Sequence, residues 1–386
     1  MPPVSSRSRS AVEPAHLVDP LIVAWGAVTA LGTALLLYLP GILGGRSYGP
    51  AFPPLHAAAA RLGAGEPLYI ADAPWTASPL LPVLLSPTGG MPIEVAWLAA
   101  GALALATWTV ASFLLVREAG VRDRGTARII ALAVALLPWF FAPAAETLIT
   151  GSTALLAGLV VAALILALDA GRGLAAGLCL TLVIAVRPEA ALFVLFLAGR
   201  RDFRTLAYAA AAGALLVALS SLVPGAGAAW GEFPARAIEA LTNPAALVGD
   251  RSLAGELAAA TVLPGGIAPL LAPGILVLAA IAAVLLGAGA PLWIGAPIVL
   301  LLSTIVLPVT APEAATPLLA TGVLLAHWVP MPGFLDRLLR PATWVILLLG
   351  AWCAVVAAAG TGPWFWAAVA APFLLAVVTA RSPRTP

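Results

Sequence analysis

The sequence predicts an all-α, polytopic membrane protein, and three observations lead to this fold class. The chain has 386 residues, of which 62% are hydrophobic and only 9% are charged, and its mean hydropathy is +1.06. A soluble domain typically carries about 25% charged residues, so this composition cannot provide a water-exposed surface. The apolar runs are continuous and about twice as long as a transmembrane β-strand of roughly 10 residues, which favours helices.

The charged residues argue against a nucleic-acid partner. The chain contains 19 Lys and Arg residues, all of them arginine, and its formal net charge is only +2. The arginines stand in short loops beside the apolar runs, which is typical of a protein surrounded by membrane lipids. The abundance of Arg, Ala and Gly suggests a GC-rich genome and therefore a bacterial source.

A sliding hydropathy window of about 19 residues predicts about 12 membrane segments. They form a single transmembrane domain over 21–380, between an N-terminal tail at 1–20 and a C-terminal tail at 381–386. The expected segments are 21–43, 93–116, 126–143, 152–169, 174–199 in two halves, 205–223, 269–288, 290–308, 314–330, 342–360 and 363–380.

The segment 174–199 is interrupted in its middle by Arg187-Pro188-Glu189. Pro188 has no backbone donor and disfavours helix at the residue before it, so we expect a helix break there. A single crossing would place Arg172 and the basic turn 199–204 on opposite faces, against the rule that short basic loops stay in the cytoplasm. Two short segments that turn at the proline keep both basic loops on one face.

The arginine distribution also predicts the orientation of the chain. If the short basic loops are cytoplasmic, both tails are cytoplasmic and two long loops, 44–92 and 224–268, face outward. Loops longer than about 12–15 residues tend to be functional, so these two loops are candidate functional regions.

The sequence contains none of the common motifs of soluble enzymes, such as a P-loop, a dinucleotide-binding glycine fingerprint or a nucleophile elbow. The three histidines, His16, His56 and His327, are far apart, so we expect no metal site and no cofactor. Cys179 and Cys353 lie in apolar runs, where a thiol behaves as a small hydrophobic group. We therefore expect no disulfide.

Ionisable residues inside or beside the apolar runs are candidate functional residues, because lipid strongly disfavours their charge. Arg187 and Glu189 flank the predicted break, and Glu146 and Glu313 follow prolines at outer helix ends. Arg187 has two interpretations. It is either a local ion-pair partner of Glu189 or a phosphate anchor, since a guanidinium binds phosphate oxygens bidentately. Solvation accounts equally well for Glu146 and Glu313.

The outward loops hold the remaining polar candidates. Glu66, Asp72 and Glu94 are the acids of the first loop. The second loop contains Asp250 and Arg251 in a short polar run with glycine near each end, which lets the backbone turn. A solvated loop explains this run equally well.

Several segments follow the order and spacing of a known family pattern. They are the small-residue run 57–64 with Gly65-Glu66-Pro67-Leu68-Tyr69 (Gly-x-Pro-Leu-Tyr in the family), Ser78-Pro79-Leu80, Gly151-Ser152-Thr153, Ala176-Gly177 through Arg187-Pro188, the basic turn 199–204, and Gly249 to Gly255. In these segments the chain resembles the polyprenyl-phosphate-mannose-dependent mannosyltransferases, glycosyltransferase family 87, of GT-C architecture.

The resemblance implies a membrane enzyme that transfers mannose from a polyprenyl-phosphate donor to a lipid or polysaccharide acceptor of the cell envelope. It implies that Arg187, where the family has lysine, binds the donor phosphate. By their place in the matching motifs, Tyr69, Asp250 and Arg251 become candidate substrate-binding residues.

The chain also departs from the family pattern. The family's presumed catalytic base is an acid ahead of the small-residue run, and Ala51 and Phe52 occupy the matching place here. The base is then Glu66, Asp72 or Glu146, or the role is vacant. Two other hypotheses stay open: a non-catalytic relative that binds the lipid carrier or a partner, and a transporter, which also uses broken helices. The internal repeats and paired intramembrane carboxylates of a transporter are not found.

Overall fold

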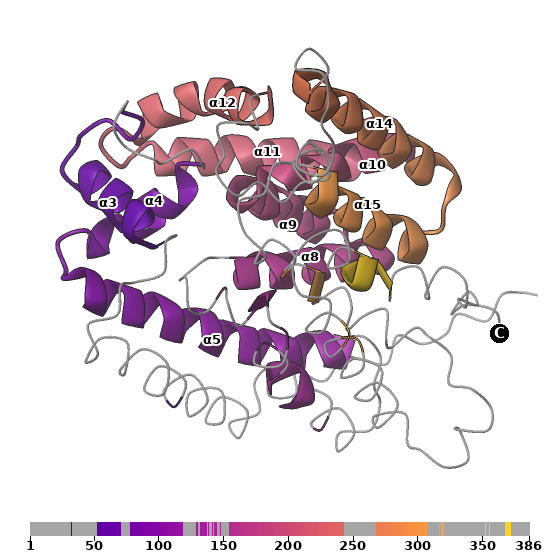
Figure 1. The fold of residues 1–386 in the computed structure, drawn as a ribbon, viewed down its shortest axis with the longest axis horizontal. Coiled ribbons are helices and arrows are strands. Elements are labelled where there is room, and N and C mark those ends of the chain that lie inside the picture. Colours follow the sequence, from indigo (N-terminus) through magenta and orange to yellow (C-terminus); the bar gives the residue numbers. More distant parts are fainter. Residues whose placement is uncertain are drawn as a thin grey trace, which may run out of the picture.

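The computed structural model describes residues 52–70, 78–118, 154–242 and 268–306, together with isolated residues and short pieces elsewhere (Figure 1). Every regular element in these ranges is a helix, which confirms the all-α prediction for the described part of the chain. The segments predicted at 21–43, 126–143, 314–330, 342–360 and 363–380 lie wholly or mostly outside the described residues.

The long apolar helices begin and end close to the predicted segments. They are α5 (Ile93–Glu118), α8 (Ala154–Asp169), α9 (Gly173–Val186), α10 (Leu192–Gly199), α11 (Phe203–Ser220), α14 (Ala268–Gly289) and α15 (Leu292–Val306). In the described ranges, the stretch Ile93–Ser112 of α5 and the whole of α11 are long and apolar enough to cross a membrane. The other apolar helices are shorter, with 10–17 residues in their apolar stretches.

The helix break at Arg187-Pro188 is present as predicted. Helix α9 ends at Val186, and Arg187 adopts an extended conformation with φ −134° and ψ 88°. A short 3₁₀ turn, η3 (Pro188–Ala191), then leads into α10. Pro188 cannot donate a helical hydrogen bond, and the chain changes direction where that donor is missing.

Helices α9 and α11 are parallel and begin side by side. A Cβ placed on Gly173 would lie 3.3 Å from Oγ1 of Thr205, near the start of α11. One turn later Gly177 lies against Tyr208, and the Thr181 hydroxyl donates to the Ala209 carbonyl at 2.8 Å. The intervening chain must therefore run away from this end and return, which keeps the two basic turns, 170–172 and 200–202, at one end as predicted.

Helix α10 returns along α14. Gly199 lies against the backbone of Val284, and Gly287 lies against the Phe196 carbonyl, so the two helix backbones approach closely where one helix has a glycine. Arg200 Nη1 also donates to the Ala290 carbonyl at 3.2 Å. The turn between α14 and α15 therefore lies at the same end as the basic turns.

Short helices gather at the opposite end of α11. They are α3 (Phe52–Gly63), α4 (Leu80–Leu85), the 3₁₀ turn η2 (Ser86–Thr88) and α12 (Ala226–Thr242). Leu62, Leu68 and Tyr69 are buried together with Ala229 of α12. The two predicted outward loops therefore contain helices, α3 and α12 (Figure 1), which share a buried apolar cluster. The hydropathy window of about 19 residues did not detect these helices because they are amphipathic, with polar residues among the apolar ones.

The main hydrophobic core lies among α5, α8, α9, α10, α14 and α15. Its largest fully buried side chains include Trp108, Phe193 and Phe196. Large apolar side chains are exposed on α11 and α14, among them Leu215 and Leu278. Exposed apolar side chains of this kind are typical of a face that contacts lipid.

Candidate functional site

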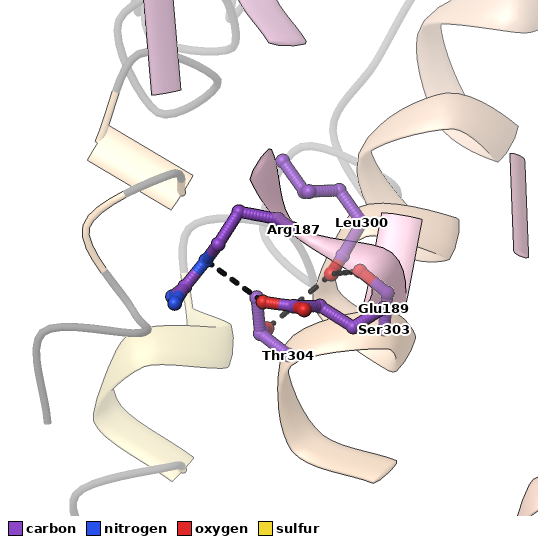
Figure 2. A network of polar contacts seen from close by, with 5 residues as sticks. All are labelled: Arg187, Glu189, Leu300, Ser303 and Thr304. Atoms are coloured by element: carbon purple, nitrogen blue, oxygen red, sulfur yellow. Dashed lines mark hydrogen bonds and ion pairs between the residues drawn. The ribbon is translucent and has the colours of Figure 1, made fainter. Parts of the chain in front are cut away.

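An ion pair stands at the break between α9 and α10. Nε of Arg187 lies 2.8 Å from Oε1 of Glu189, and the two side chains are only 20% and 17% exposed (Figure 2). The extended Arg187 and the 3₁₀ turn that begins at Pro188 place the two charged residues close together. Apolar core helices surround this pair, so either charge would be strongly destabilising without a partner of opposite charge.

Arg187 has hydrogen-bonding capacity that Glu189 does not use. Its Nη2 is buried without a hydrogen-bond partner in the described part of the chain, and its Nε–H is not aligned on the nearby carboxylate oxygen. Nε–H and Nη2 form the same edge of the guanidinium, the edge that binds two anionic oxygens side by side. Buried donors without a partner are costly, so this edge is a candidate anion-binding group.

Helix α15 lies beside the 3₁₀ turn and contributes two buried hydroxyl groups. Ser303 donates to the Leu300 carbonyl at 2.7 Å, and Thr304 donates to the Leu301 carbonyl at 2.9 Å. Both hydroxyl hydrogens therefore bond within α15, as Figure 2 shows for the bonds to Leu300. Within the described residues, Arg187 is the group that balances the charge of Glu189.

Ser78 connects the segment before α4 to the break. Its side chain is 2% exposed, and its hydroxyl donates to the Ala185 carbonyl. In an unbroken helix that carbonyl would accept from the backbone N–H of Glu189, four residues further on. Ser78 thus replaces a hydrogen bond that the break removes, and it holds the start of α4 against the end of α9.

Comparison with known proteins decides the family. The sequence model of glycosyltransferase family 87 matches residues 75–312, which is more than half of the chain and includes α4 through α15 with the break. The chain belongs to glycosyltransferase family 87. This family consists of membrane glycosyltransferases, whose reaction requires a sugar donor and a glycan or lipid acceptor. No curated protein matches the chain.

Two of the predicted site residues of this glycosyltransferase lie near α3 and α12. Glu66 is exposed in the turn after α3, and its carbonyl lies 3.1 Å from the position of a Cβ on Gly225, just before α12. Tyr69 is buried against α12. Burial raises the pKa of the Tyr69 phenol far above its usual value, the nearby Glu232 adds to the increase, and Arg236 opposes it. The phenol therefore stays protonated at neutral pH.

The other predicted site residues of the glycosyltransferase, Asp72, Glu146, Asp250 and Arg251, lie outside the described residues, as does Glu313. Ser78 stands in one of the family segments, but its contact with the break was not predicted from the sequence, because its partner is 107 positions away. Within the described ranges, no group of three or more His, Cys, Asp or Glu side chains is arranged to hold a metal ion.

We predict that Ser78→Ala destabilises the glycosyltransferase by about 1–3 kcal/mol, because the buried Ala185 carbonyl loses its donor. The measurement is the thermal unfolding of purified protein in detergent. Ser221→Ala is the matched control, since the exposed Ser221 hydroxyl bonds only to Val217 of its own helix. Equal unfolding temperatures for Ser78→Ala and wild type would show that the break does not depend on this bond.

Proposed function

We propose that this glycosyltransferase transfers mannose from a polyprenyl-phosphate carrier to a hydroxyl group of a cell-envelope lipid or polysaccharide, in a multi-pass, GT-C-like frame. The observation that carries the proposal is the guanidinium edge of Arg187. It lies at the helix break with one buried, unpartnered donor and one poorly aligned donor. Such an edge suits a phosphate group.

The chemistry of sugar transfer accounts for a cation at this place. When the bond between the sugar and the phosphate breaks, negative charge develops on the departing phosphate oxygen. A preorganised cation in a site of low dielectric stabilises that charge strongly. The helices around Arg187 are apolar, which supports a phosphate that arrives on a lipid tail rather than from water.

The acceptor hydroxyl must lose its proton to a base. Glu66, Asp72 and Glu146 are the candidates that the sequence offers, and the exposed position of Glu66 on the outer helices is compatible with contact with a polar acceptor. We further propose that Tyr69, Asp250 and Arg251 help to bind substrate from the outer segments. Burial of Tyr69 against α12 supports a role in which it fixes α12 beside the first outer segment.

We also propose that both termini are cytoplasmic and that segments 44–92 and 224–268 face outward. The grouping of the basic turns at one end, and of α3, α4 and α12 at the other, supports this orientation. The Arg187 break and Ser78 then belong to the outward half of the protein.

The orientation predicts the accessibility of introduced cysteines. In a background with Cys179 and Cys353 replaced by alanine, a cysteine at the exposed position Ala228 of α12 is expected to react with an impermeant maleimide on intact cells. A cysteine at the exposed Ala170, beside the first basic turn, is expected to react only after the membrane is opened. The reverse pattern would contradict the proposed orientation.

Arg187→Ala is expected to weaken donor binding at least about tenfold, because charge-assisted hydrogen bonds to the phosphate are worth about 1.5–3 kcal/mol each. Arg187→Lys is expected to have a milder effect, since an ammonium keeps the charge and loses the planar edge. The measurement is equilibrium binding of a short-chain polyprenyl-phosphate mannose to purified protein, with folding checked by thermal unfolding.

Two further variants separate the phosphate site from a purely local ion pair. Arg187→Ala/Glu189→Ala restores binding if the only function of Arg187 is to neutralise Glu189, and it stays weak if Arg187 holds the phosphate. Arg204→Ala is the arginine control, because Arg204 is exposed at the basic end and bonds to Tyr208 of its own helix. Unchanged affinity in a folded Arg187→Ala protein would refute the proposed site.

A further inference from the structure

Glu189 stands beside the edge of Arg187 that a phosphate would need. The carboxylate oxygen is 2.8 Å from Nε, but neither Nε nor Nη2 has a hydrogen-bond partner in the described part of the chain. A phosphate that binds this edge with two oxygens takes the Nε–H as well as Nη2. It therefore comes close to the carboxylate and competes with it for the charge of Arg187.

The backbone keeps Glu189 within reach of Arg187 while a ligand is bound. The two residues are separated only by Pro188, and the Ala190 N–H donates to the Arg187 carbonyl at 2.9 Å, which closes the turn between them. A tethered group of this kind has a high effective concentration at its partner. The ion pair is therefore expected to form again whenever a ligand leaves.

The surroundings of Glu189 offer its carboxylate little compensation when a phosphate competes for Arg187. The nearby hydroxyl hydrogens of Ser303 and Thr304 bond to carbonyls of α15. Among the described residues, Glu189 pairs with Arg187. A negative charge thus remains beside the bound phosphate, and the repulsion increases with the charge of that phosphate.

We infer that Glu189 is a built-in competitor for Arg187 that favours the donor over the spent lipid carrier. The inference rests on the proposed function, in which Arg187 binds the donor phosphate. The donor is a phosphodiester with one negative charge. The carrier left after transfer is a phosphomonoester, which carries about 1.5 to 2 negative charges at neutral pH because its second pKa is about 6.

This difference in charge arises in the reaction itself. The acceptor oxygen forms a bond to the anomeric carbon of the sugar, and the bond from that carbon to the phosphate oxygen breaks. The electron pair of the broken bond stays on the phosphate, and the proton of the acceptor goes to the base. Transfer therefore raises the negative charge next to Glu189, which assists release of the spent carrier.

The test compares wild type with Glu189→Gln, which keeps the shape of the side chain and removes its charge. The two probes are a short-chain polyprenyl-phosphate mannose and the polyprenyl phosphate of the same length. We expect the donor to bind about threefold to fivefold more tightly to the variant than to wild type. The phosphomonoester is expected to bind at least about tenfold more tightly, because its second charge doubles the repulsion from Glu189 that the variant removes. Glu232→Gln removes an exposed carboxylate on α12 and is the control.

Kinetics provide a second readout. Glu189→Gln is expected to be slower over many turnovers than in its first turnover, and to be inhibited more strongly by polyprenyl phosphate than wild type. Glu189→Ala is expected to change both affinities in the same direction, which keeps the test decisive if one variant is poorly folded.

Each contrary result has a separate meaning. Weaker binding of both lipids to Glu189→Gln would show that Glu189 orients Arg187, and equal gains for both would remove the discrimination by charge. Loss of the single turnover would mean that the carboxylate takes part in the chemistry and does not act as a competitor.

The two proposals can fail separately. If Arg187→Ala weakens donor binding while Glu189→Gln changes neither affinity, only the role of Glu189 is rejected. Normal donor binding to Arg187→Ala would reject the proposed function itself.

Discussion

Pro188 has no backbone N–H, and the geometry of the candidate site depends on that missing donor. Because the helix cannot continue through it, α9 ends at Val186 and a 3₁₀ turn follows. The Ala185 carbonyl is then available to Ser78, which joins the segment before α4 to the break. The same turn places Arg187 and Glu189 side by side within an apolar surrounding.

The break also determines how the neighbouring helices pack. Because the chain turns back at Arg187, α9 and α10 each contact a different partner helix. Glycines make both contacts close: Gly177 faces Tyr208 of α11, and Gly287 of α14 faces the Phe196 carbonyl of α10. Packing through small residues is typical of helices in membranes, where apolar lipid provides little hydrophobic driving force between them. These contacts hold the two halves of the broken segment in fixed positions.

The sequence predicted the features that follow from local chemistry. Pro188 specified the break, continuous apolar runs specified the helices, and the positions of Arg172 and Arg200 required both basic turns to lie at one end. Features that depend on distant partners were not predictable. Nothing adjacent to Ser78 indicates that its hydroxyl meets Ala185, and the short helices α3 and α12 become evident only through their packing on each other. Its charge within an apolar run and the family resemblance both indicated Arg187 as a candidate. The unpartnered donor on its guanidinium is a finding of the structure.

The central claim is that the guanidinium edge at the helix break binds the phosphate of a lipid-linked sugar donor. An experimental structure of the protein with bound polyprenyl phosphate tests this claim most directly. The account predicts phosphate oxygens at about 2.7–2.9 Å from Nε and Nη2 of Arg187, on the edge that Glu189 leaves open. A phosphate bound elsewhere, with the Arg187–Glu189 ion pair intact, would contradict it.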